Sequence, residues 1–115
     1  MQDNLKIFEF NKKKIRIENI NNEAYFCSID ICNILEYKNH TTAIQDNCDQ
    51  DGLTASYIID TIGRKQKTTF LNEANLYRLI MKSTMPKAKV FQDWVCKNVL
   101  PTIRKTGSYN AIQQP

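Results

Sequence analysis

The stretch Phe70–Ile80, FLNEANLYRLI, changes within three residues from the pattern of a strand to that of a helix. Asn72 is a favourable N-cap residue, because its side-chain oxygen can accept a hydrogen bond from a backbone N–H of the first turn. Leu71 and Leu76 have the spacing of a hydrophobic staple across that cap. We therefore expect a strand that ends at Leu71 and a helix that ends near Ser83. The residues expected to face the core are Leu76, Tyr77, Leu79 and Ile80.

A longer helical pattern follows this stretch. Pro86 suits its first turn, where the missing N–H costs nothing. The apolar residues share one face and stay in register across Pro101, which predicts a kink and not a stop. Lys105 suits the C-terminal end of the helix dipole, and Gly107 suits a left-handed cap. The apolar face consists of Ala88, Phe91, Trp94, Val95, Val99 and Ile103.

A β-hairpin is predicted directly N-terminal to the helix of the Phe70–Ile80 stretch. Tyr57–Asp60 and Lys67–Leu71 are rich in residues that favour strands, and the loop TIGRKQ between them has Gly63 as its turn residue. Three cations surround that loop. The hairpin therefore resembles a basic wing.

The N-terminal part of the chain predicts three short strands and two short helices. LKIFEF, KIRIENI and EAYFC are joined by tight Asn-containing turns, which indicates an antiparallel meander. Ser28 is expected to cap a helix over Ile29–Leu35 that buries Ile31, Cys32 and Leu35, and Asp30 suits the dipole of its first turn. Thr41 or Thr42 is expected to cap a second helix through about Cys48. The predicted fold class is α+β: meander, two short helices, hairpin, then two helices, the last one long and kinked.

Composition sets the broad class. The chain has 115 residues, enough for one domain, with residues 1–109 as the domain and 110–115 as a linker or tail. It has no long apolar run and no signal-like N-terminus, which favours an intracellular protein that does not cross a membrane, with reduced cysteines. Residues 1–51 carry six Lys/Arg against nine Asp/Glu, whereas residues 52–115 carry ten against three. The basic half is either a footprint for a polyanion or an ordinary solvated face.

Several motifs together resemble a known family. The first half contains Tyr25-Phe26, Ser28–Cys32 (SIDIC), Ile34-Leu35 and Tyr37–Asn39 (YKN). The second half contains Phe70–Ile80, Lys82-Ser83, Ala88-Lys89, FQDWV from Phe91, and VLPTIRKTG from Val99 to Gly107. In combination these motifs resemble the Bro-N domain of viral BRO proteins and phage antirepressors. The resemblance covers roughly residues 5–109.

This resemblance implies an α+β fold and a role in DNA binding or gene regulation in a large DNA virus, phage or prophage. The expected compartment is then the host cytoplasm or nucleus. Three features depart from the family. His40 stands where many members have proline, the residues between Asp49 and Thr61 follow the family pattern only loosely, and we find no match to the second domain that often follows Bro-N. Double-stranded DNA is the partner we expect. Two rival functions are an antirepressor-type module that binds a repressor protein and a homodimerisation module for a second domain.

Eight cations are the candidate DNA contacts. Arg64, Lys65 and Lys67 surround the hairpin tip and could contact phosphates, or they form a solvated turn. Arg78 is either a phosphate contact or a local ion-pair partner. The final helix carries the remaining four cations, which could follow a DNA backbone or could form the solvent-exposed face of that helix. They are Lys89, Lys97, Arg104 and Lys105. A helix-turn-helix over Ile29–Leu35 and Thr42–Cys48 is an alternative that the acidic charge of that region disfavours.

Other site chemistries find little support. Cys27, Cys32, His40 and Cys48 are metal-ligand types, but their spacing matches no zinc pattern. The chain has one histidine and no phosphate-binding glycine loop or nucleophile–base pattern, so we expect no cofactor and no enzymatic activity. Phe91, Trp94 and Tyr77 lie at helical core spacing, which predicts packing rather than base stacking.

Overall fold

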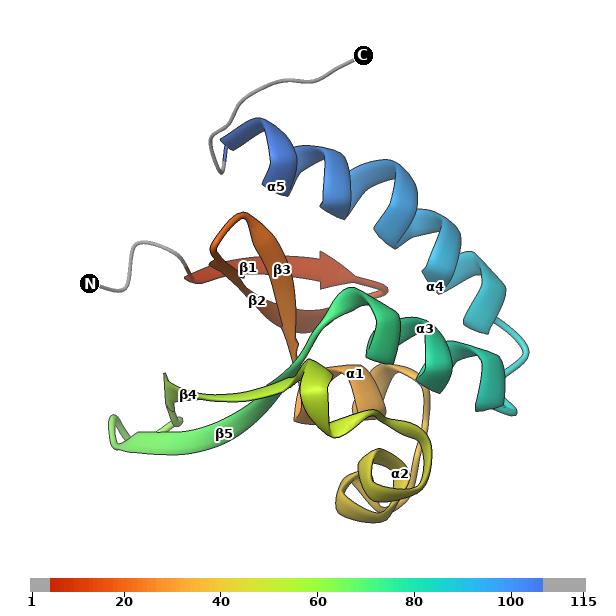
Figure 1. Ribbon diagram of the computed structural model, residues 1–115, viewed down its shortest axis with the longest axis horizontal. Coiled ribbons are helices and arrows are strands. Elements are labelled where there is room, and N and C mark those ends of the chain that lie inside the picture. The colour runs from red at the N-terminus through yellow and green to blue at the C-terminus, as the bar shows by residue number, and fades with distance from the viewer. Residues whose placement is uncertain (1–4, 107–115) are drawn as a thin grey trace.

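The computed structural model describes residues 5–106, and side chains as far as residue 103. Its centre is a five-stranded antiparallel sheet in the order β1-β2-β3-β5-β4. Figure 1 shows α3, α4 and α5 alongside the meander, with α1 and α2 below it and the β4–β5 hairpin projecting to one side. The predicted α+β class is confirmed. The expected roles of Arg104, Lys105, Gly107 and the tail 110–115 concern side chains or segments outside the described part of the chain.

The N-terminal meander forms as predicted. It consists of β1 (Leu5–Phe10), β2 (Lys13–Ile20) and β3 (Glu23–Cys27), paired antiparallel in sequence order. Its two turns use Asn11-Lys12 and Asn21-Asn22, and all four residues have positive φ. A two-residue turn with both φ values positive matches the twist of the flanking strands, and Asn tolerates that conformation better than most residues. These two-residue turns therefore set the register in which the three strands pair.

The hairpin is longer than predicted. Its strands are β4 (Leu53–Ile59) and β5 (Lys65–Leu71), and they pair along their whole length. By contrast, β5 pairs with β3 through only two residue pairs, Phe26 with Leu71 and Cys27 with Phe70. β3 ends at Cys27 because the chain turns directly into a helix there. Among residues 5–106, no strand therefore pairs with the outer part of β5 on its β3 side.

The first two helices start earlier than predicted. α1 spans Ser28–Ile34, so Ser28 is a buried helical residue, and the prediction that it is the N-cap was wrong. Because β3 runs straight into the helix, the cap position falls on Cys27, whose side chain makes no capping bond. α2 spans His40–Asn47 and is capped by Asn39, whose side chain accepts from the Thr42 N–H at 3.1 Å. The predicted Thr41 or Thr42 cap was therefore also wrong.

The segment Phe70–Ile80 has the predicted structure, a strand that leads into a helix. α3 spans Glu73–Lys82, and the Asn72 side chain accepts from the Asn75 N–H at 3.0 Å. Leu71 and Leu76 are fully buried in the same core cluster, as the staple requires. A 3₁₀ turn, η2 (Gln50–Gly52), precedes β4, and Asn72 donates its backbone N–H to the Gly52 carbonyl at 2.9 Å. The N-terminus of α3 is thus held against the start of the hairpin.

The C-terminal helix continues past its proline. It consists of α4 (Ala88–Trp94), a π-helical turn η3 (Val95–Val99) and α5 (Leu100–Thr106) without a break. Pro101 therefore does not end the helix, as predicted. The prediction for Pro86 was wrong, because that residue lies in a turn before α4. Within η3, Leu100 donates its N–H to the Val95 carbonyl, the wider spacing of a π turn, one residue before the proline that has no N–H to donate.

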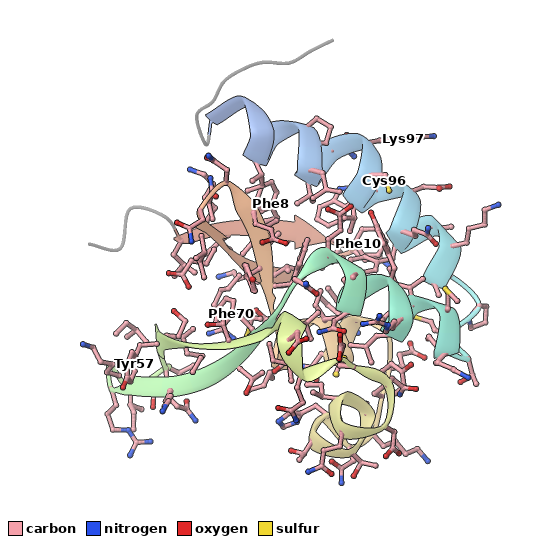
Figure 2. All side chains as sticks on the ribbon, viewed as in Figure 1. Phe8, Phe10, Tyr57, Phe70, Cys96 and Lys97 are labelled. Carbon is pink, nitrogen blue, oxygen red and sulfur yellow. The ribbon has the colours of Figure 1, made fainter. Side chains whose placement is uncertain are left out.

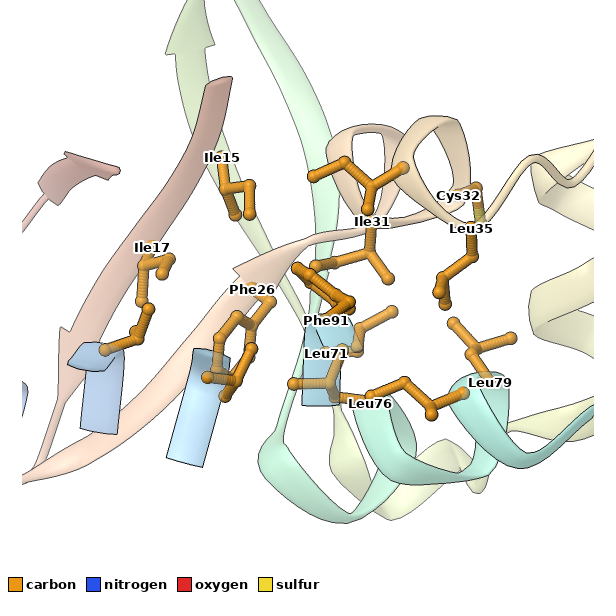
Figure 3. Close-up of a cluster of buried hydrophobic side chains, with 14 of the residues drawn as sticks. Ile15, Ile17, Phe26, Ile31, Cys32, Leu35, Leu71, Leu76, Leu79 and Phe91 are labelled. Carbon is orange, nitrogen blue, oxygen red and sulfur yellow. The ribbon is translucent and has the colours of Figure 1, made fainter. Parts of the chain in front are cut away.

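The main core lies between the meander and the helices. Figure 3 shows its side chains pointing toward one another from both layers. Ile15, Ile17 and Phe26 come from the sheet, and Phe91 comes from α4. Trp94 is half-buried and packs at 5.0 Å from Phe10 and 6.3 Å from Phe8, measured between ring centroids. The predicted packing role of Phe91 and Trp94 is confirmed.

Candidate nucleic-acid interface

The tip of the β4–β5 hairpin is organised by one carboxylate. Asp60 accepts backbone N–H groups from Ile62 at 3.0 Å and from Arg64 at 2.8 Å. The hydrogen bonds from Arg64 and Ile62 lower the pKa of Asp60 below its usual value. Gly63 has φ +84°, a conformation that suits glycine. The predicted turn residue is confirmed.

The three hairpin cations have different surroundings. The Arg64 guanidinium lies 3.1 Å from Asp60, in an ion pair that leaves its side chain 73% exposed. The Lys65 ammonium lies 5.3 Å from the centroid of the Tyr57 ring, a cation–π contact. Among residues 5–103, no ion pair joins Lys67 to a carboxylate. Lys67 is therefore the hairpin cation whose charge is least compensated by the protein.

Arg78 supports local structure. Its Nη1 donates to Asn75 Oδ1 at 2.7 Å. Asn75 is completely buried and bonds the main chain of Asp49 twice, accepting from its N–H at 2.8 Å and donating to its carbonyl at 2.9 Å. Arg78 thus reinforces the contact between α3 and the loop before β4. Within the described side chains it forms no ion pair.

The cations of the C-terminal helix lie apart from the hairpin. Lys89 and Lys97 are exposed. Figure 2 shows Lys97 on the C-terminal helix and Tyr57 on the hairpin at opposite ends of the molecule. The hairpin cations and Lys97 therefore do not form one continuous surface. They are two separate candidate patches.

A polar groove lies between α2 and β5, and sequence reasoning missed it. Its volume is about 440 Å³, and its floor includes Ile44 and Leu53. Most of the polar residues that line it come from these two elements: His40, Thr41 and Gln45 from α2, and Gln66, Lys67, Thr68 and Thr69 from β5. Ser28 of α1 also lines it. No local sequence pattern predicts this groove, because it depends on how far β5 extends beyond β3.

The structure agrees with the helix-turn-helix alternative only in the order of its elements, two consecutive short helices. α1 and α2 are consecutive, and the exposed side of α2 carries His40, Thr41, Thr42, Gln45 and Asp46. Asp46 keeps one end of this face acidic. The part of α2 that borders the groove carries no acid. α2 is therefore a candidate contact element through its groove side.

The metal-ligand residue types do not converge. In the described part of the chain, no group of three His, Cys, Asp or Glu side chains could hold a metal ion. Cys27 and Cys32 are buried, Cys48 is half-buried, Cys96 is exposed, and all four thiols are free. Tyr77 lies near Cys96, with its hydroxyl 3.2 Å from the sulfur and 3.0 Å from Glu73 Oε2. Desolvation, followed by these two contacts, raises the pKa of Tyr77.

Between residues 5 and 106, no helix is long and apolar enough to cross a membrane.

Comparisons with known proteins agree with the fold and motifs. Residues 14–101 match the model of the Bro-N family, described as the BRO family, N-terminal domain. An uncharacterized protein of Haemophilus influenzae is 45% identical over 99% of this chain and 58% of its own length. The putative Bro-N domain-containing protein 201R of Invertebrate iridescent virus 6 is 32% identical over 90% of this chain and 29% of its own. No solved structure gives a significant match.

The relatives are longer than this chain. It spans 58% of the Haemophilus protein and about a third or less of the viral proteins, including 33% of the Bro-N domain-containing protein ORF2 of Autographa californica nuclear polyhedrosis virus. The similarity therefore concerns one domain of those proteins.

Proposed function

The chain belongs to the Bro-N family, and from that premise we propose that it is a non-enzymatic, DNA-binding regulatory domain of a virus, phage or prophage protein. One observation carries the proposal: the β4–β5 hairpin projects beyond the body of the domain and presents Arg64, Lys65 and Lys67 to solvent. Lysine and arginine on a protruding element can approach phosphates without displacing packed side chains. The C-terminal helix offers Lys89 and Lys97 as a second patch at the other end.

A protein-binding function is the second candidate, because the same hairpin also exposes large apolar side chains. Tyr57, Ile59 and Ile62 are 56%, 62% and 69% exposed. In addition, β4 is an edge strand without a charged residue, whereas natural edge strands are commonly protected by charges. Such an edge suits contact with a repressor protein or a second copy of this chain.

Binding to random-sequence duplex DNA over a salt series distinguishes these functions. A DNA-binding domain releases condensed counterions, so its affinity falls steeply and linearly with salt on a log–log plot. Absence of binding at about 50 mM salt, where non-specific contacts are favoured, would remove the DNA proposal. A sizing measurement on the same samples then tests the second candidate, since a homodimerisation module elutes as a dimer without DNA.

A further inference from the structure

The groove between α2 and β5 borders a strand edge that the sheet leaves open. β3 pairs with β5 only at Phe70 and Leu71, so within the described part of the chain the residues from Lys65 to Thr69 pair with β4 alone. The groove lies along Gln66–Thr69, and Leu53 at the start of β4 and Ser28 and Ile29 of α1 also line it. Its opposite wall is α2.

The ladder register determines which backbone groups face the groove. Asp60 donates its N–H to the Arg64 carbonyl at 2.9 Å, which makes this a hydrogen-bonded pair. In an antiparallel ladder such pairs alternate with non-bonded ones, so Gln66 and Thr68 bond across to β4. Lys67 lies between them and directs its N–H and C=O away from β4. Both the backbone and the exposed side chain of Lys67 are thus available on the groove side.

The side chains along the groove have the chemistry of a polyanion site. No carboxylate occurs among the described residues that line it, although the half of the sequence that supplies α2 is net acidic. Lys67 provides a cation, Thr41 and Thr69 provide hydroxyls, and Gln45 and Gln66 provide amides from facing walls. Lysine, threonine and backbone N–H groups commonly bind phosphate oxygens, whereas a glutamine amide can pair with the donor and acceptor on an adenine edge.

We propose that the α2–β5 groove holds one strand of the DNA target, with Lys67 on a phosphate and Gln45 and Gln66 facing a base edge. The proposal rests on the DNA-binding function above and assigns sequence recognition to this groove. The hairpin tip and the C-terminal helix then supply contacts that do not depend on sequence. A phosphate in the groove would be repelled by a carboxylate, and the α2 residues that line the groove include none. Asp46, on the same helix, does not line it.

The test uses the 115-residue chain and duplexes that it selects from a random pool. Lys67→Ala should weaken binding to selected and scrambled duplexes alike and flatten the log–log salt slope by about 0.9. Gln45→Ala should reduce discrimination between selected and scrambled duplexes about 5- to 100-fold with the salt slope unchanged. Lys97→Ala is the matched control, because it removes the same charge at the other end of the molecule. It should leave discrimination unchanged.

Backbone amide NMR of the labelled chain maps the site independently. Adding the selected duplex should shift the amides of Lys67–Thr69 and of α2 more than those around Lys97. If the wild type binds DNA while the shifts gather around Lys97, and neither Lys67→Ala nor Gln45→Ala changes binding, the groove proposal is overturned and the DNA-binding function stands. If the wild type binds no duplex at low salt, both are overturned.

Discussion

Arg16 on β2 binds Asp30 on α1 through three hydrogen bonds. The guanidinium donates from Nη2 to Oδ1 at 2.8 Å and from Nε to Oδ2 at 2.9 Å, and the Arg16 backbone N–H donates to Oδ2 at 2.9 Å. The Asp30 side chain is only 8% exposed. This hydrogen bonding raises the pKa of Arg16. The pair joins the meander to the first helix, so Asp30 does more than favour the helix dipole.

Breaking this pair should destabilise the domain. Arg16→Met leaves a nearly buried carboxylate without its cation, and we expect a loss of about 2–4 kcal/mol in the free energy of unfolding. Asp30→Asn keeps an acceptor for the Arg16 N–H and should cost less. Urea unfolding of both variants and of the double variant gives the coupling energy, which we expect to be about 1–3 kcal/mol. Arg64→Met is the control, since its ion pair is exposed and should contribute little. A coupling energy near zero would show that the pair is only a surface contact.

Gly52 should resist substitution for a steric reason. A Cβ atom there would lie 2.5 Å from Asn72 Oδ1 and 2.5 Å from Asn75 Nδ2, so the α3 cap and the Asn75 contacts would have to move. Loss of a cap and of a buried hydrogen bond together predicts a cost of about 2–3 kcal/mol for Gly52→Ala. Gly63→Ala is the matched control, because Gly63 has open space and only an unfavourable φ. That variant should lose about 1 kcal/mol in thermal or urea unfolding. Equal costs at both positions would contradict the steric argument.

Pro101→Ala should preserve the fold and change the direction of the last helical turns. Alanine restores an N–H that can donate within the helix, so the π turn η3 is no longer needed to accommodate a missing donor. Residual dipolar couplings of the amides on either side of residue 101 measure the change. Unchanged couplings would show that the packing of Val95 and Val99, and not the proline, maintains the π turn.

The four cysteines should differ in reactivity in the folded protein. Cys96 is exposed and should react first with a thiol reagent. Cys27 and Cys32 are buried, and burial raises the pKa of Cys32 to about 12, so little reactive thiolate forms near neutral pH. After denaturation without reductant, all four should react. Two fewer reactive thiols would reveal a disulfide and contradict the free cysteines of the fold.

The hairpin cations can be tested as a group. Changing Arg64, Lys65 and Lys67 together to Ala should weaken binding to all duplexes similarly and flatten the log–log salt slope by about two to three units. All three side chains are exposed, so the melting temperature should change little. Lys87 is the exposed N-cap residue of α4, and a matching triple change of Lys87, Lys89 and Lys97 reports on the C-terminal helix. If only this second triple variant flattens the slope, the helix is the phosphate-binding element.

Features that depend on near neighbours along the chain could be predicted from the residues. Asn11-Lys12 and Asn21-Asn22 specify tight turns, Asn72 caps α3, and the apolar face of the last helix continues past Pro101, because each signal lies within a few residues. Local signals predicted the wrong caps for α1 and α2. β3 runs directly into α1, which moves its cap position from Ser28 to Cys27. In α2 the cap is Asn39, which comes before the two threonines that were predicted as caps.

Contacts between residues far apart in the sequence depend on how the helices and strands pack in three dimensions. Arg16 and Asp30 are fourteen residues apart, and no periodicity pairs them. The groove between α2 and β5 lies along residues of β5 that extend beyond its two-residue pairing with β3. That pairing is short because a helix begins where the strand would continue. Contacts between elements depend on how their ends are placed in three dimensions, and residue spacing along the chain does not record this.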